Sequence, residues 1–251
     1  MEINKIYNED IFVFLNNTRN ETFDLIIIDP PYNILNEKWD SFDNDKVYFD
    51  FIKKIIDLCF LKLKKNGSLY IFNTARNSAH TLLIAEKRGL KFRNWIIWDK
   101  NISFYFPKKK YVNIHETILF FTKGNKNTFN YDNIRIPHTK LVLKNKKNKI
   151  WDNFEFYNSK GKLSTDIWRH NSIGYDLKTN NKKMIHPSQK PIKVIEKIIK
   201  ASSNENDLVL DLFSGTGTTS IAAKKLKRNF VGVEINKKYV EIAKKRLSDI
   251  R

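Results

Sequence analysis

The segment DPPYN at 29–33 carries the residues best suited to chemistry in this sequence. It follows the largely apolar run 24–28, and ligands in open α/β sheets bind beyond the carboxyl ends of the strands. The Asp29 carboxylate and the Pro30 carbonyl, which two consecutive prolines keep free of helical hydrogen bonding, are two acceptors. Together they can bind the hydrogens of an exocyclic amino group such as that of adenine and restore the lone pair on its nitrogen, while Tyr32 stacks on the base. The plainer interpretation is a turn after a strand, in which Tyr32 only packs.

A glycine-containing loop, DLFSGTGTTS at 211–220, begins at the end of another apolar run. Gly215 and Gly217 allow a sharp turn from strand to helix and a close approach of backbone amides to a ligand. Glu234 closes the next apolar run, nineteen positions beyond Gly215, where an acidic side chain can accept hydrogen bonds from both ribose hydroxyls. These features predict a nucleotide-like ligand. NAD stays an alternative, because Ser220 could be the third small residue of a dinucleotide fingerprint, although no other motif supports hydride transfer.

Both motifs need a framework that brings their strands side by side. Short apolar runs, which predict strands, alternate with segments of helical periodicity such as 49–63, 77–88 and 192–200. The predicted strands are 24–28, 68–72, 92–98, 116–121, 208–213 and 230–235. Strands separated by helices indicate βαβ units, so the sequence predicts an α/β fold with a doubly wound, mostly parallel sheet.

Three regions of the chain differ in composition. Residues 1–100 and 186–251 have the regular alternation of strands and helices, whereas 101–185 is rich in Lys, Asn and aromatic residues. This middle region holds 17 Lys and Arg against 6 Asp and Glu. The whole chain has a net charge of +19, which favours a polyanionic partner such as a nucleic acid. The alternative is an AT-rich genome, which raises the lysine content without regard to function.

The middle region also holds the candidates for contacts with a nucleic acid. Three consecutive lysines stand close to the aromatic residues at 104–106, which combines positive charge with stacking surfaces. The candidates for phosphate or base-edge contacts are Lys108, Lys109, Lys110, Arg135, Arg169 and His170. For each of them taken singly, a charged side chain that only faces water remains the alternative.

Composition excludes several classes of protein. No apolar run reaches the roughly 18 residues that a membrane-spanning helix needs, and the charged N-terminus does not resemble a signal peptide. The one cysteine, Cys59, cannot form an intramolecular disulfide, and its place in a helical pattern predicts a buried side chain. The five histidines show no metal-ligand spacing, so no metal site is expected. We expect a reduced, cytoplasmic protein.

DPPYN and DLFSGTGTT together resemble motifs of the amino-methylating DNA methyltransferases of restriction–modification systems. The order of the two motifs is similar to that in the beta class of this family, and HPSQKP at 186–191 resembles the motif that precedes the cofactor strand in that class. The resemblance implies a Rossmann-like fold that binds S-adenosylmethionine, with 1–100 as the catalytic half and 186–251 as the cofactor-binding half. The middle region, 101–185, matches the position of the target-recognition region, and the target base is expected to be flipped out of the DNA.

The resemblance also implies roles for single residues. Those that match the catalytic tetrapeptide are Asp29, Pro30, Pro31 and Tyr32. Those that match the cofactor site are Asp10, Lys190, Asp211, Phe213, Ser214, Gly215, Gly217, Thr218 and Glu234. Glu234 is the implied ribose ligand, and Lys190 is the implied partner of the cofactor carboxylate. Asp10 matches a residue near the adenine of the cofactor, although capping of a helix explains an aspartate at this position equally well.

The expected target of such an enzyme is adenine, since Asp29 stands where cytosine-amino members more often carry serine. A cytosine-amino DNA methyltransferase is the nearest alternative, followed by an RNA methyltransferase and by a basic nucleic-acid-binding protein without catalysis. The intact motif at 29–32 argues against the last of these, and the basic middle region argues against a small-molecule substrate. The expected partners are double-stranded DNA, a second copy of the chain in a homodimer, and a cognate restriction endonuclease that acts on the same site.

Overall fold

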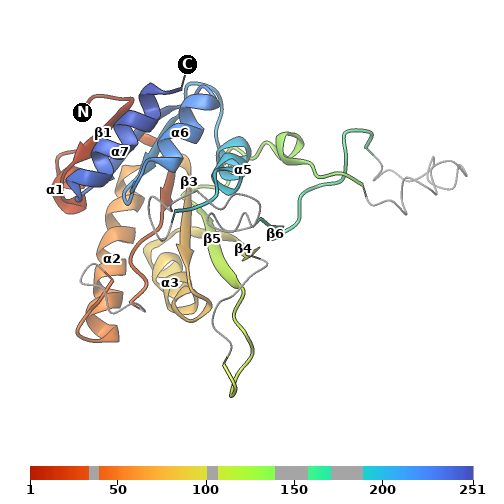
Figure 1. Cartoon of the computed structure of the whole chain (residues 1–251), viewed down its shortest axis with the longest axis horizontal. Coiled ribbons are helices and arrows are strands. Elements are labelled where there is room, and N and C mark those ends of the chain that lie inside the picture. Colours follow the sequence, from red (N-terminus) through yellow and green to blue (C-terminus); the bar gives the residue numbers. More distant parts are fainter. Residues whose placement is uncertain (34–39, 101–106, 139–157, 171–188, 251) are drawn as a thin grey trace, which may run out of the picture.

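The computed structural model describes residues 1–33, 40–100, 107–138, 158–170 and 189–250. These ranges contain one eight-stranded sheet with the order β1-β8-β7-β2-β3-β5-β4-β6 (Figure 1). The strands are β1 (Lys5–Asn8), β2 (Phe23–Ile28), β3 (Leu63–Asn73), β4 (Lys91–Asp99), β5 (His115–Thr122), β6 (Ile167–Arg169), β7 (Leu208–Asp211) and β8 (Asn229–Glu234). The helices are α1 (Ile11–Asn16), α2 (Asp45–Lys62), α3 (Ala75–Arg88), η1 (Tyr131–Ile134), α5 (Ile192–Ser202), α6 (Thr218–Lys225) and α7 (Lys237–Ser248).

The sheet is mostly parallel, as the sequence predicts. Strand β2 pairs in parallel with β3 and β7, and β8 pairs in parallel with β7 and β1. Strand β5 runs antiparallel to both of its neighbours, β3 and β4, while β6 adds in parallel to β4 at the edge. The predicted strand at 116–121 therefore belongs to the sheet. The middle region of the chain contributes β5 and β6 to the same sheet as residues 1–100 and 186–251.

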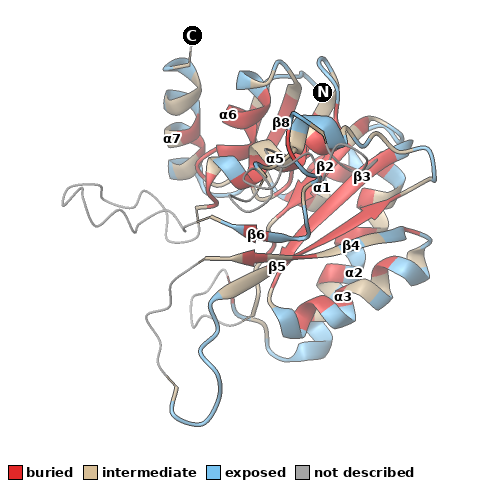
Figure 2. Cartoon of the chain, turned by 90° about the vertical axis from the view of Figure 1, so that its right-hand side faces the viewer, coloured by how far each residue is buried: buried red, intermediate tan, exposed pale blue. Residues whose placement is uncertain are grey.

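Helices cover both faces of the sheet, which explains why its central strands are continuous apolar runs. The residues of β2 from Leu25 to Ile28 are all buried, and they alternate between two separate cores. Ile26 and Ile28 pack with α1, α2 and α3, whereas Leu25 and Ile27 pack with α5, α6 and α7. Figure 2 shows the buried strands in the middle and the exposed residues on the outer sides of α2 and α3. The fold is a three-layer α/β/α sandwich.

The predicted and observed boundaries agree at the end of α3 and differ at the starts of α3 and β3. Helix α3 ends at Gly89, whose φ of 99° is typical of a glycine C-cap. Strand β3 begins at Leu63, five residues before the predicted start at position 68. A Cβ at Gly67 would lie 2.7 Å from Leu63 Cδ2, so this glycine permits a close contact within the strand and does not end the preceding helix. Cys59 is buried in α2, as expected, and burial raises the pKa of its thiol to about 12.

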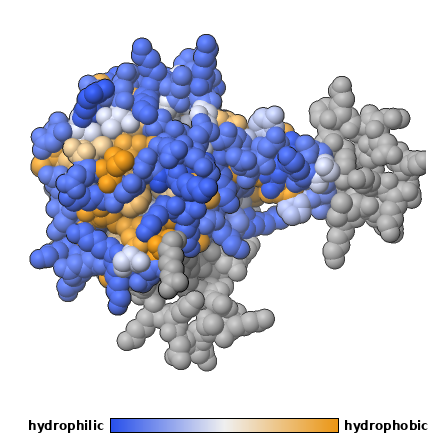
Figure 3. All heavy atoms as spheres, turned by 90° about the horizontal axis from the view of Figure 1, so that it is seen from above, coloured by the Kyte–Doolittle hydropathy of each residue, from blue (hydrophilic) through white to orange (hydrophobic). Residues whose placement is uncertain are grey.

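The surface carries the high charge of the chain. Figure 3 shows that most of the face seen from above is hydrophilic. Within the described ranges, no helix is both long enough and apolar enough to cross a membrane.

Candidate active site

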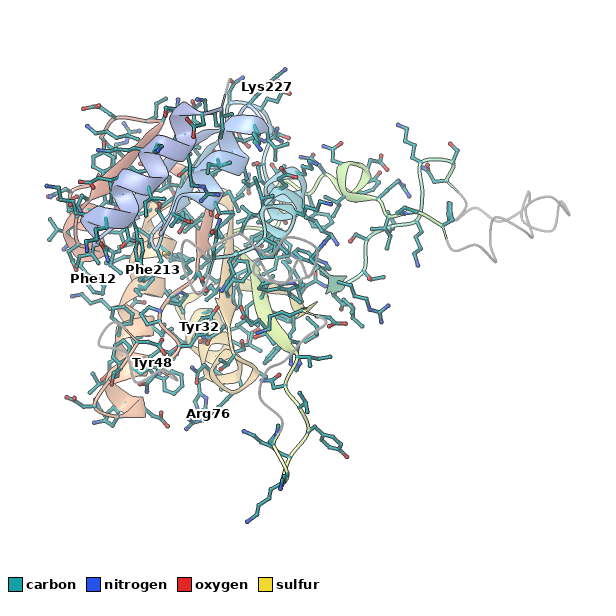
Figure 4. The ribbon with its side chains drawn as sticks, in the orientation of Figure 1. Phe12, Tyr32, Tyr48, Arg76, Phe213 and Lys227 are labelled. Carbon is teal, nitrogen blue, oxygen red and sulfur yellow. The ribbon has the colours of Figure 1, made fainter. Side chains whose placement is uncertain are left out.

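A cavity of about 360 Å³ opens at the carboxyl ends of the neighbouring strands β2, β7 and β8. Its volume falls within the roughly 300–1,000 Å³ of small-molecule sites. Tyr32 and Phe213, both labelled in Figure 4, reach it from the segments after β2 and β7. The residues of the sequence prediction that line it are Asp29, Pro30, Pro31, Tyr32, Lys190, Asp211, Phe213, Ser214, Gly215, Thr218 and Glu234. The two motifs, which are far apart in the sequence, thus share one cavity.

The loop after β7 depends on two glycines. Gly215 and Gly217 have φ values of 49° and 81°, a conformation that other residues rarely adopt. A Cβ at Gly217 would also lie 2.8 Å from the Cβ of Ala243 in α7. On β8, a Cβ at Gly232 would lie 2.7 Å from Ser214 Oγ. The glycines therefore let the loop turn sharply into α6 while it stays close to β8 and α7.

Glu234, the last residue of β8, joins the end of this strand to the glycine loop. Its Oε2 accepts a hydrogen bond from the Gly215 amide at 2.9 Å, and its Oε1 accepts one from the Asn236 amide at 2.7 Å. Burial raises the pKa of the Glu234 carboxyl, and these amide hydrogen bonds partly offset that effect. Ile235, which follows in the cavity wall, is 72% exposed and offers an apolar surface beside the carboxylate. A carboxylate beside an apolar surface suits a ribose with an attached base.

Asp211 supplies a second carboxylate at the end of β7. It is buried in the cavity wall, where it accepts hydrogen bonds from the Phe213 amide, at 3.0 Å, and from the Thr219 side chain. Burial raises the pKa of Asp211 to about 7. It forms no ion pair within the part of the chain that the structure describes. A ligand with an ammonium group would compensate this negative charge, so Asp211 and Glu234 together fit a ligand that carries both a nucleoside and an amine.

Asp29 follows β2 and faces the same cavity. Its Oδ1 accepts a hydrogen bond from the Tyr32 hydroxyl, and its Oδ2 lies 2.9 Å from Lys190 Nζ. Burial raises the pKa of the Asp29 carboxyl, although the ammonium of Lys190 opposes this shift. Desolvation and the nearby Asp29 carboxylate also raise the pKa of the Tyr32 hydroxyl well above its usual value. Tyr32 is therefore a neutral donor, and Asp29 is an acceptor held in place by two partners.

The ammonium of Lys190 is shared between two carboxylates. Besides Asp29, it lies 3.2 Å from Glu116 Oε2, near the start of β5, and 3.2 Å from the Tyr32 hydroxyl. Glu116 has a second cation, Lys100, at 3.1 Å. Burial disfavours the charge of Glu116, but the two ammonium groups outweigh burial and hold the pKa of this carboxyl below its usual value. The expected contact between Lys190 and a cofactor carboxylate stays a prediction, since this lysine lines the cavity while its charge is engaged by Asp29 and Glu116.

Side chains from two other segments hold the backbone of the DPPYN loop. The buried Asp40 carboxylate accepts hydrogen bonds from the amides of Tyr32 and Asn33, the latter at 3.1 Å. Asn33 has a positive φ of 57°, and its side chain accepts a hydrogen bond from an amide at 3.0 Å. From α3, the side-chain Nδ2 of Asn77 donates a hydrogen bond to the Tyr32 carbonyl at 2.6 Å. These contacts fix the direction in which Asp29 and Tyr32 project.

Three residues of the site, Glu116, Asp40 and Asn77, were not predicted from the sequence. Glu116 begins a predicted strand, but no spacing links it to the motif at 29–33. Asp40 and Asn77 act on backbone groups of the loop, and such contacts leave no pattern in the sequence. Two predicted residues lie outside the cavity lining. Asp10 caps α1 through the amides of Phe12 and Val13, so its place near a cofactor stays a prediction, and Gly217 shapes the start of α6.

The candidates for DNA contact differ in their surroundings. Lys108, Lys109 and Lys110 are exposed on the segment between β4 and β5 that projects from the body in Figure 1. Arg135 is only 11% exposed, because its guanidinium donates to Asp132 at 2.6 Å and to the Gly161 carbonyl at 2.8 Å. Arg169 and His170 lie at the end of the edge strand β6. The side chain of Arg169 is 76% exposed and lies 3.5 Å from an Asp99 oxygen. Burial and the nearby Lys197 and Lys193 lower the pKa of His170.

No group of three or more His, Cys, Asp or Glu side chains that could hold a metal ion occurs among the residues the structure describes. The charged groups that line the cavity are Asp29, Asp40, Lys190, Asp211 and Glu234, and Glu116 contacts Lys190. They offer acceptors for an amino group, for ribose hydroxyls and for an ammonium group.

Comparisons with known proteins agree with this geometry. A family model described as DNA methylase matches residues 23–245. The type II methyltransferase M1.MboII of Moraxella bovis is 44% identical over 255 residues, which cover 97% of this chain and 96% of that protein. The DNA adenine methyltransferase YhdJ of Escherichia coli strain K12 is 33% identical over 257 residues, covering 98% and 83%. The crystal structure of an M1.HpyAVI–SAM complex is 29% identical with a TM-score of 0.65, covering 97% and 99%.

Proposed function

The chain belongs to the DNA methylase family, so it is a DNA methyltransferase that uses S-adenosylmethionine, and we propose that it methylates the exocyclic amino group of adenine in double-stranded DNA. The observation that carries this proposal is the position of Asp29. Its partly buried carboxylate faces the cavity that Asp211 and Glu234 also line. The adenine target is supported by this aspartate and by the similarity to the DNA adenine methyltransferase YhdJ.

The residues of the cavity fit S-adenosylmethionine. Glu234 would accept hydrogen bonds from the ribose hydroxyls, Ile235 would contact the base, and Asp211 would face the ammonium of the methionine part. Gly215 lines the cavity without a side chain that would point into it, and Gly217 lets the loop pack closely on α7. When bound, the cofactor supplies a methyl group on a positively charged sulfur, which a nitrogen nucleophile can attack.

The residues of the DPPYN loop would prepare that nucleophile. The Asp29 carboxylate and the Pro30 carbonyl accept hydrogen bonds from the amino group, which returns the lone pair to the nitrogen. The negative charge of Asp29 also stabilises the positive charge that develops there. Tyr32 stacks on the base, and Asp40 and Asn77 keep the loop in place. A base inside a duplex cannot reach this buried carboxylate, so the target adenine is flipped out of the helix.

The middle region, 101–185, is the proposed target-recognition region of this enzyme. Its exposed lysines at 108–110 and the fully exposed Tyr111, at 98%, lie on the projecting segment between β4 and β5. Lysines neutralise phosphates, and an aromatic ring offers a stacking surface. The predicted contacts at 104–106 lie outside the described residues.

Neutralising Lys108, Lys109 and Lys110 together by glutamine is expected to weaken DNA binding about ten-fold at moderate salt. Because each lost phosphate contact releases about 0.9 fewer counterions, the slope of log K against log salt should become shallower by about 2 to 3. Titrations of labelled duplex DNA at several salt concentrations measure both quantities. The matched control replaces three exposed lysines of α7, Lys237, Lys238 and Lys244. An unchanged slope in the first variant contradicts the assignment.

The partners beyond DNA are also part of the proposal. We expect a cognate restriction endonuclease that acts on the same DNA site, since several relatives are named type II methyltransferases. A homodimer is expected as well. The cytoplasm is the expected location.

The function is tested by identifying the methylated base. The purified protein is incubated with unmethylated genomic DNA and labelled S-adenosylmethionine, and the digested nucleosides are then separated. Label on an amino-methylated adenine is the expected result. Label on an amino-methylated cytosine would retain the mechanism and overturn the target base. Two results would overturn the proposal. One is label on RNA and none on DNA, and the other is a protein that binds the cofactor but labels no nucleic acid.

A further inference from the structure

Two partly buried carboxylates share one ammonium group beside the cavity. Lys190 Nζ lies 2.9 Å from Asp29 Oδ2 and 3.2 Å from Glu116 Oε2. The exposed fractions of the Lys190, Asp29 and Glu116 side chains are 8%, 22% and 18%, so the three charges interact with little screening by water. The ammonium also lies 5.4 Å from the centroids of the Tyr32 and Phe72 rings, which restrict its position further.

Glu116 reaches this place from a different direction than the catalytic motif. Asp29 follows the parallel strand β2, whereas Glu116 lies near the start of β5, which is antiparallel to β3. Strand β5 therefore begins at the edge of the sheet where β2 ends. The other oxygen of Glu116, Oε1, accepts a hydrogen bond from Lys100 Nζ at 3.1 Å, and the Lys100 side chain is 26% exposed. The charged cluster of Asp29, Lys190 and Glu116 thus includes a second cation, Lys100, which is more exposed to water than Lys190.

The charge count explains what Glu116 contributes. Asp29 paired with Lys190 alone would be close to neutral, and a neutralised carboxylate is a weak acceptor for a third group. With Glu116 present, Lys190 is divided between two acceptors, and the second ammonium group, that of Lys100, lies on the far side of Glu116. The four side chains together are neutral, but Lys190 neutralises Asp29 less completely than it would alone. The negative potential at Asp29 is then retained in the place where positive charge develops on an attacked amino nitrogen.

We propose that Glu116 is a positioning residue for methyl transfer, which holds the Lys190 ammonium between two carboxylates so that Lys190 does not fully neutralise Asp29 and the Asp29 carboxylate keeps its direction toward the target amino group. This inference rests on the proposed function of Asp29. Glu116 acts through Lys190 and Asp29 and does not touch the target base.

The groups around Asp29 act on its protonation in opposite directions. Burial raises the pKa of Asp29, Lys190 lowers it, Glu116 raises it, and the Tyr32 hydroxyl lowers it. Asp211 is the next carboxylate in the same cavity, and it interacts with Asp29 through space. Removal of the Glu116 charge should therefore lower the pKa of Asp29, and removal of the Lys190 charge should raise it. If Glu116 and Lys190 had only structural roles, removing their charges would not shift the pKa of Asp29 in opposite directions.

The test compares single-turnover rates of methyl transfer against pH for the whole protein and its variants. Glu116→Gln is expected to lower the rate at pH 8 by about ten-fold, because a small misplacement of Asp29 is costly, while the Kd for S-adenosylmethionine stays unchanged. Its acidic limb should move to lower pH, since Asp29 stays ionised further down. Lys190→Met should move the acidic limb to higher pH. Glu116→Asp should recover part of the rate, and the exposed Glu86→Gln should behave like the unchanged protein.

Three outcomes separate this inference from the proposed function. A Glu116→Gln variant with the rate and the acidic limb of the unchanged protein overturns the role of Glu116. If that variant does not fold, an acidic limb of Lys190→Met that fails to move upward overturns it instead. Absence of methyl transfer to DNA by the unchanged protein overturns the proposed function itself.

Discussion

Replacing Asp29 by alanine is expected to lower kcat for methyl transfer by about a thousand-fold or more while the protein still binds S-adenosylmethionine. The carboxylate is the one charged acceptor of the DPPYN loop, and a single preorganised electrostatic contact to a transition state is worth about 10²- to 10³-fold. The variant also leaves Lys190 with Glu116 as its remaining carboxylate, so the negative charge that would face the reacting nitrogen is lost while the ammonium beside it stays. Single-turnover assays at saturating cofactor and DNA measure the effect.

Two further variants define the cause of that loss. Asp29→Asn keeps the shape and one acceptor oxygen but not the charge, so its rate should lie between those of Asp29→Ala and the unchanged protein. Asp24, at the other end of β2, is the matched control, because it pairs with Lys64 at 2.8 Å far from the cavity. Asp24→Asn should retain the rate. Full methyl transfer by Asp29→Ala at saturating cofactor would refute the proposed role.

The fold and one wall of the site could be predicted from the sequence because both follow a simple rule. Asp29 follows one apolar run, Asp211 and Glu234 end two others, and the carboxyl ends of parallel strands lie at the same edge of a sheet. Burial of β2 on both faces produces the continuous apolar run that marks it as a central strand. The observed parallel pairing of β2, β7 and β8 then brings the three carboxylates around one cavity.

The same rule explains why Glu116 was missed. The apolar pattern of a strand does not indicate its direction in the sheet, and β5 runs antiparallel to β3. Its first residues, not its last, therefore lie at the edge of the sheet that holds the site. The boundary at Leu63 was missed for a related reason, since an apolar residue fits a helix pattern and a strand equally well. Asp40 could not be predicted either, because it recognises amide groups that every sequence contains.

Lys190 shows the difference between assigning a residue to a site and assigning its role. Its place in HPSQKP predicted that it would line the cavity, and it does. The resemblance implied a cofactor carboxylate as its partner, whereas the structure has two carboxylates of the protein within 3.2 Å of its ammonium. Arg135 is a similar case in the middle region. It was predicted to contact DNA, and in the structure its guanidinium donates to Asp132 and Gly161.

Replacing Glu234 by alanine is expected to raise the Kd for S-adenosylmethionine about 100-fold, while the rate at saturating cofactor changes by no more than a few-fold. Hydrogen bonds to a charged acceptor are worth about 1.5 kcal/mol or more each, so two ribose hydroxyls account for about 3 kcal/mol. The variant also frees the amides of Gly215 and Asn236, which lie at 2.9 and 2.7 Å from the carboxylate, and loosens the glycine loop. Calorimetric titration with the cofactor gives the Kd directly.

The separation of binding from rate is what makes the Glu234 experiment decisive. Glu234 lies at the end of β8, and its proposed partner is a part of the cofactor that does not react, so its loss should weaken the binding of cofactor and transition state equally. Glu234→Gln retains an acceptor oxygen and should raise the Kd only about ten-fold, whereas Glu241→Ala, on the exposed side of α7, should leave it unchanged. An unchanged Kd in Glu234→Ala would remove the nucleoside from this end of the cavity. A large fall in the saturated rate would place Glu234 with Asp29 in the reacting part of the site, because only contacts made in the transition state alone lower kcat in this way.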